Sequence, residues 1–215
     1  MPEWLSKAGK FLQERRERKE QEASHPFWVI VQKEISDQVS SWRFVILLSI
    51  IALTCIGSLY TAMMTIRSSV DKADNAFVFL QLFTTTDGTL PSFITFVGFL
   101  GPLLGIGMGF DAINSERNKG TLSRVMSQPI HRDSLLNAKF VAALIVISGL
   151  FFALGFLVMG FGLITIGIPP TPEEFWRIVF FLILTIFYVA FWLNLSILFS
   201  VRFRQPATSA LSCIA

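Results

Sequence analysis

Four long apolar stretches alternate with short polar segments along this chain. A helix needs about 20 apolar residues to cross a membrane, because each residue rises about 1.5 Å and the hydrocarbon core is about 30 Å thick. Windows of that length lie at residues 44–66, 91–110, 140–168 and 178–201. The pattern predicts an all-α, polytopic membrane protein with a transmembrane domain over residues 43–215. The apolar stretch 207–215 predicts the start of a fifth span.

The pattern changes twice before the first span. Residues 1–26 are rich in Lys, Arg and Glu and have almost no apolar face, which predicts a solvated cytoplasmic arm, with a docking element as the alternative. Over residues 27–42 apolar side chains recur every three or four positions. We predict an amphipathic elbow helix in the membrane interface, anchored by Trp28 and Trp42. The alternative is a cytoplasmic helix packed on a partner.

Small and polar residues within the spans suggest how the helices meet. Gly101, Gly105 and Gly109 recur every four residues in the second span, so they form one flat stripe on a helix. Such a stripe predicts close helix packing in lipid, while a hinge at Pro102 is a second interpretation that can coexist with it. In the fourth span, Asn194 is predicted to hydrogen-bond to a neighbouring helix.

Hydrophobic residues make up 53% of the chain, and its net charge is +3. The Lys and Arg residues lie almost entirely before the first span, between the second and third, and after the fourth. Because cytoplasmic loops carry the excess of Lys and Arg, we predict a protein of the cell membrane with both ends of this chain cytoplasmic. The basic residues alternate with Glu residues before the first span, so nucleic-acid binding is not expected.

The chain lacks the motifs of an enzyme. It has no Gly-x-x-x-x-Gly-Lys-Ser/Thr phosphate loop and no His or Cys residues at metal-binding spacing. Its two histidines, His25 and His131, stand near no nucleophile with a carboxylate partner. We expect no catalytic residue, no metal and no cofactor, and any ATP hydrolysis must belong to a partner.

The segment 111–139 between the second and third spans is the most informative part of the chain. It contains a helix-like stretch over residues 120–127, a stop at Pro129, and a second helical start over residues 131–139. A simple turn would be much shorter, so the segment is predicted to present a cytoplasmic surface.

The order of residues in this segment resembles the first cytoplasmic loop of type-2 ATP-binding-cassette transporter permeases. The resemblance extends over the elbow helix, the four spans and the start of a fifth. It implies a coupling loop that contacts a separately encoded ATPase, with a second permease copy or other membrane subunits, and the bilayer, as further partners. The residues that carry the resemblance and would form the coupling site are Glu116, Gly120, Thr121, Leu122, Ser127, Pro129 and Arg132.

Members of that family typically have six spans, whereas this chain stops as the fifth begins. Two hypotheses follow: the chain is a fragment of a longer permease, or it is a shortened relative that has lost transport. The second hypothesis allows a different function, a helical scaffold subunit of a larger membrane complex. Co-purification with an ATPase that carries a phosphate loop would favour the transporter. Co-purification with a large assembly lacking such an ATPase would favour the scaffold.

Overall fold

The computed structural model describes residues 26–69, 78–84, 91–120, 132–166 and 169–214, and within these ranges it contains helices and no strand. The prediction of an all-α protein is confirmed. The described helices are α2 (Pro26–Val39), α3 (Trp42–Ser69), α4 (Val78–Thr84), α5 (Phe93–Gly109), α6 (Asn114–Asn118), α8 (Arg132–Ile166), α9 (Pro172–Arg202) and α10 (Pro206–Ile214).

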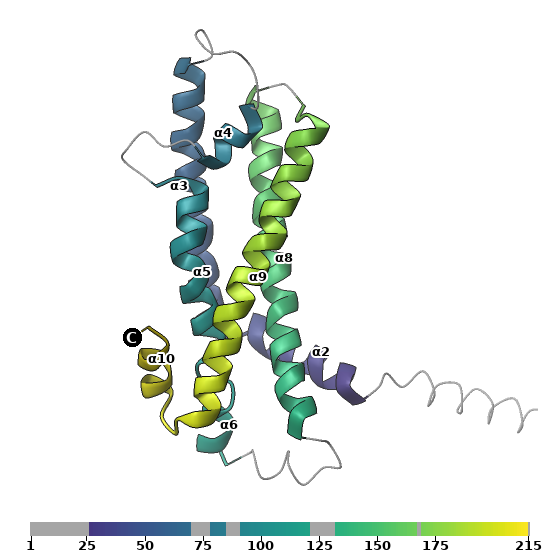
Figure 1. Ribbon diagram of the computed structural model, residues 1–215, viewed down its shortest axis with the longest axis vertical. Coiled ribbons are helices and arrows are strands. Elements are labelled where there is room, and N and C mark those ends of the chain that lie inside the picture. The colour runs from purple at the N-terminus through teal and green to yellow at the C-terminus, as the bar shows by residue number, and fades with distance from the viewer. Residues whose placement is uncertain (1–25, 70–77, 85–90, 121–131, 167–168, 215) are drawn as a thin grey trace, which may run out of the picture.

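Four of the described helices, α3, α5, α8 and α9, are long and apolar enough to cross a membrane. They run along the long axis of the molecule in Figure 1, while α2, α6 and α10 lie at one end and α4 lies at the other. The four predicted windows fall on these four helices. The chain is therefore a multi-pass helical membrane protein.

The third span begins earlier than its apolar window. Residues 132–139, which the sequence placed in the loop as a separate helical start, form the first turns of α8. No Gly or Pro interrupts the chain between Arg132 and Phe140, and Asp133 in the first turn suits the positive end of the helix dipole. The connector between α5 and α8 is correspondingly shorter than the predicted segment 111–139.

The predicted elbow helix over residues 27–42 is interrupted near its end. Helix α2 stops at Val39, and Trp42 is the first residue of α3. Ser41 explains the break, because its Oγ accepts a hydrogen bond from the Phe44 N–H at 3.2 Å and donates one to the Gln38 carbonyl at 2.7 Å. The hydroxyl thereby hydrogen-bonds to the last turn of α2 through the Gln38 carbonyl and to the first turn of α3 through the Phe44 N–H. The chain can therefore change direction here.

Helices α5 and α9 approach closely along the glycine stripe. A Cβ atom added to Gly105 would lie 2.9 Å from the Val189 carbonyl oxygen and 3.0 Å from the Leu193 nitrogen. One added to Gly109 would lie 3.0 Å from the Leu193 carbonyl oxygen, and one added to Gly101 would lie 3.1 Å from the Val189 Cγ2 atom. At Gly105 and Gly109, glycine is what lets the two backbones meet.

Pro102 lies inside α5 and is compensated by the same neighbour. Proline has no N–H group, so the carbonyl of Gly98, four residues earlier, loses its helical partner. The Tyr188 hydroxyl of α9 donates a hydrogen bond to this carbonyl at 3.1 Å. The exposed carbonyl therefore binds α5 to α9 in addition to the glycine contacts.

Asn194 does not make the predicted cross-helix hydrogen bond, because it lies on an exposed face of α9. The buried serines of α9 make such bonds instead. Ser196 Oγ donates to the Ile106 carbonyl of α5 at 3.1 Å. A serine hydroxyl is small enough to fit between closely packed helices, whereas an amide side chain needs more room.

Candidate functional site

The connector after the second span begins with the short helix α6, which is capped by another helix. The first N–H groups of a helix have no partner within it, and Ile113, which precedes α6, has no side-chain acceptor. Ser200 of α9 supplies the acceptor: the N–H groups of Ile113 and Asn114 donate to its Oγ at 3.1 and 3.4 Å. Gly120 follows the end of α6 with φ +69°, a left-handed conformation that favours glycine.

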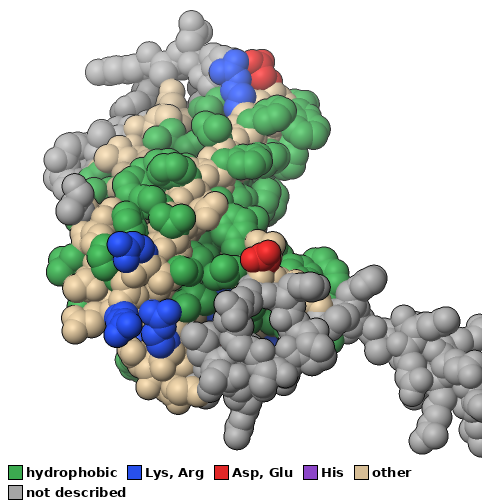
Figure 2. Space-filling model, turned by 60° about the horizontal axis from the view of Figure 1, so that its bottom comes forward, with side chains coloured by type: hydrophobic (Ala, Val, Ile, Leu, Met, Phe, Trp, Pro, Cys, Tyr) green, Lys and Arg blue, Asp and Glu red, His purple; other side chains and the backbone are tan. Residues whose placement is uncertain are grey.

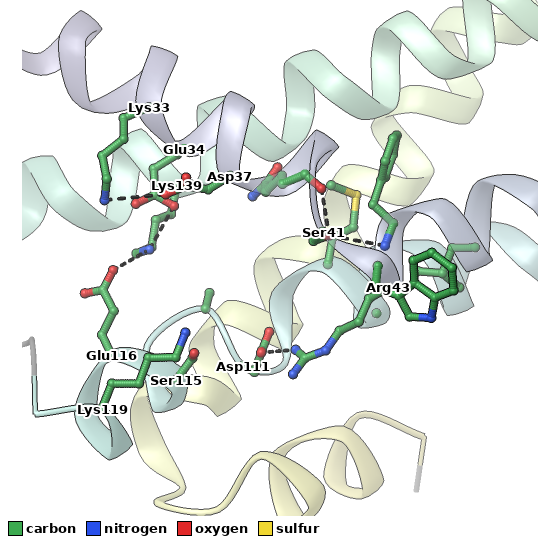
Figure 3. A pocket seen from close by; sticks show the side chains of 17 residues that line it. Lys33, Glu34, Asp37, Ser41, Arg43, Asp111, Ser115, Glu116, Lys119 and Lys139 are labelled. Carbon is green, nitrogen blue, oxygen red and sulfur yellow. Dashed lines mark hydrogen bonds and ion pairs between the residues drawn. The ribbon is translucent and has the colours of Figure 1, made fainter.

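A buried ion cluster joins α6 to two other helices. The Lys139 Nζ atom of α8 lies 2.9 Å from Glu34 Oε2 of α2 and 2.8 Å from Glu116 Oε1 of α6. Figure 3 shows the lysine between the two carboxylates. The Lys139, Glu34 and Glu116 side chains are 7%, 10% and 18% exposed, so water screens these interactions little. The cluster holds together three segments that are far apart in the sequence.

A second ion pair ties the same connector to the first span. The Arg43 guanidinium, in the first turn of α3, pairs with the Asp111 carboxylate in the turn between α5 and α6. The Arg43 Cζ atom also lies 5.4 Å from the centre of the Phe110 ring, a distance at which a cation and an aromatic face attract. The start of the connector is thus bound directly to α3, α8 and α9. It is bound to α2 through Lys139.

Helix α2 reaches the cluster because it packs along α8. Val31 is buried against Ala138 and Ala142 of α8, and partly buried apolar residues surround this contact. Glu34 is one turn further along the same buried face. Trp28 and Trp42 remain 53% and 77% exposed. Their role as interfacial anchors stays a prediction.

These contacts surround a cavity of about 600 Å³ with both signs of charge. The charged residues that line it are Lys33, Glu34, Asp37, Arg43, Asp111, Glu116, Lys119 and Lys139. In the part of the chain that the structure describes, no three His, Cys, Asp or Glu side chains are grouped to hold a metal ion.

The structure brings only part of the predicted coupling site together. Glu116 lies in the ion cluster, Gly120 follows the end of α6, and Arg132 is the first residue of α8. The helix predicted over residues 120–127 lies, apart from Gly120, outside the described residues. The other four residues, Thr121, Leu122, Ser127 and Pro129, lie outside the described residues.

Sequence reasoning missed the partners of Glu116. The sequence pattern places Lys139 at the end of the segment 111–139 and Glu34 within the elbow helix, and it does not predict that they meet. A signal was present, because Glu34 follows Ile30 by four residues and Val31 by three, and residues at these spacings share a helix face. Ser200 gave no signal, since its partners are backbone N–H groups from a distant segment.

Comparison with known proteins identifies the family of the chain. The family model described as ABC-2 family transporter protein matches residues 28–215, from α2 to α10. The probable ABC transporter permease protein NosY of Stutzerimonas stutzeri is 34% identical over 91 residues, which cover 42% of this chain and 31% of that protein. The match thus spans less than a third of that relative's length. The chain belongs to the ABC-2 family of transporter proteins.

Proposed function

We propose that this chain is the membrane-spanning subunit of an ATP-binding-cassette transporter. In this proposal, a separate ATPase docks on the connector between α5 and α8, and movements of the ATPase pass into the helices. The ion cluster of Lys139, Glu34 and Glu116 is the observation that carries the proposal. The absence of a phosphate loop from the sequence is consistent with hydrolysis by a partner.

The cluster suits this role because it makes the connector part of the helical framework. Glu116 is the only carboxylate of α6, and it pairs with Lys139 in the second turn of α8. Lys139 also pairs with Glu34 of α2. A displacement of α6 would therefore pull on α2 and α8 through buried ionic contacts rather than through a flexible loop. Breaking such contacts is unfavourable, because it leaves uncompensated charges in a poorly solvated place.

The proposal separates two kinds of residue in the connector. We propose Leu122 as a docking residue, because the Gly120-Thr121-Leu122 turn resembles the coupling loops of the family. Glu116 points inward to Lys139, so it is offered as a residue that transmits movement. Leu122→Asp should then weaken capture of the ATPase, whereas Glu116→Gln should retain capture and lower substrate-dependent ATP turnover.

The test is co-purification of the membrane complex from its native source, followed by ATPase capture and ATP turnover for each variant. Arg177→Gln is a suitable control, because it removes a charge at the opposite end of α9. If an ATPase is captured and neither connector variant changes capture or turnover, the coupling role is wrong. If the chain purifies in an assembly without any ATPase, the scaffold hypothesis replaces it.

A further inference from the structure

A second groove at the same end of the bundle is lined by charges of one sign only. It has a volume of about 1080 Å³ and lies between α6, the start of α8 and the end of α9. Its lining residues are Arg117, Leu136, Asn137, Phe140, Asn194, Ile197, Leu198, Phe199, Val201, Arg202 and Arg204. Three are arginines and none is acidic, in contrast to the mixed charges of the first cavity.

Among the described residues, no carboxylate forms an ion pair with Arg117, Arg202 or Arg204, and the ion pairs use other basic side chains. The connecting residues 121–131 contain no Asp or Glu, so this stretch of the chain has no carboxylate to offer. The groove therefore attracts an anion.

The remaining wall of the groove is apolar and continues into the surface of a membrane-spanning helix. Leu198 and Val201 of α9 are 60% and 43% exposed, and Arg202 is the last residue of that helix. Figure 2 shows Lys and Arg side chains gathered low on one side of the molecule, beside hydrophobic ones. A basic cluster directly after an exposed apolar helix surface marks the boundary between hydrocarbon and headgroups.

We propose that this groove binds one anionic phospholipid. Its phosphate would lie among Arg117, Arg202 and Arg204, where guanidinium groups can form charge-assisted hydrogen bonds to phosphate oxygens. Its acyl chains would lie along Leu198 and Val201. A soluble phosphate could use the arginines but would gain nothing from this apolar wall. The inference does not depend on the proposed coupling to an ATPase.

The test is native mass spectrometry of the full chain, purified in mild detergent with equal amounts of phosphatidylglycerol and phosphatidylcholine. The wild-type chain should retain phosphatidylglycerol preferentially. The double variant Arg202→Gln/Arg204→Gln should lose that preference by on the order of tenfold, because each basic residue near an anionic headgroup contributes several-fold to binding. The double variant Arg202→Lys/Arg204→Lys should keep most of this lipid preference, because it keeps both positive charges. The comparison distinguishes loss of charge from misfolding as the cause of the effect.

Arg177→Gln is the matched control, because it removes one arginine from the other end of α9 and should leave the preference unchanged. Equal retention of the two lipids by the wild-type chain would overturn the proposal, as would an undiminished preference in the double Gln variant. Displacement of the lipid by millimolar inorganic phosphate would identify an anion site instead. If the double Gln variant lost a co-purifying protein partner and kept its preference for phosphatidylglycerol, the groove would be an interface for an acidic protein surface.

Discussion

Lys139 Nζ lies 2.8 Å from Glu116 Oε1, although Lys139 belongs to the third span helix α8 and Glu116 to the short helix α6 that precedes it. The contact fixes α6 to the beginning of the third span. Because Lys139 also pairs with Glu34, one buried cation serves two carboxylates from different helices. The stability of this end of the bundle therefore depends strongly on a single side chain.

Lys139→Met should destabilise the protein by about 3–5 kcal/mol, because it leaves Glu34 and Glu116 buried without their cation. Loss of helical circular dichroism during titration with sodium dodecyl sulfate would measure this. Lys33→Met is the control, since Lys33 is 68% exposed and pairs with Asp37 only at the surface. Adding Glu34→Gln to Lys139→Met should recover part of the loss. Equal stability of the Lys139 and Lys33 variants would show that the cluster contributes little.

Gly105→Ala should destabilise the contact between α5 and α9 by on the order of 1–3 kcal/mol, because its Cβ would meet backbone atoms that cannot move aside. Gly98→Ala, in the same helix, should be neutral or slightly stabilising, since no atom lies within 4 Å of its added Cβ. The same detergent titration measures both. Similar losses at the two positions would contradict the glycine contact.

Tyr188→Phe should weaken the same interface by roughly 0.6–1.7 kcal/mol, because it leaves the Gly98 carbonyl without a partner. The effect should disappear when Pro102 is replaced by Ala, since alanine restores the N–H group that can bond to Gly98. A double-mutant cycle measured by unfolding gives this coupling. A Tyr188→Phe effect that is unchanged by Pro102→Ala would show that the hydroxyl does not compensate the proline.

The distribution of Lys and Arg predicts that the connector faces the cytoplasm. In a chain without its two native cysteines, a cysteine placed at Asn75 or Thr171 should react with an impermeant maleimide added to intact cells. A cysteine at Ser123 should react only after the cells are opened. Labelling of position 123 from outside would reverse the orientation.

The spans could be predicted because an apolar window is a local property of the chain. The windows located α3, α5, α8 and α9, and the glycine spacing indicated the face of α5 that meets α9. The start of α8 was missed because its first turns are polar, and polar helical turns resemble a loop in a hydropathy pattern. The break at Ser41 was missed because serine also fits within a helix.

The candidate site was harder to predict because its contacts join distant positions. Glu116 is predicted as a site residue from the resemblance of the connector to the permease loops, but that resemblance does not pair it with Lys139. Glu34 is separated from Lys139 by 105 positions. The periodicity of α2 could not show that a carboxylate within its apolar stripe faces a lysine, because that depends on how α2 lies along α8.

Ser200 has a consequence for the order in which the protein assembles. It caps α6 from a position 87 residues later in the chain than Ile113, so α6 is synthesised long before the hydroxyl that holds its first turn. A helix as short as α6 has little stability of its own. Its described geometry therefore forms only after the fourth span has been inserted beside the second. A partner that recognises this folded connector would bind completed bundles and pass over chains still being made.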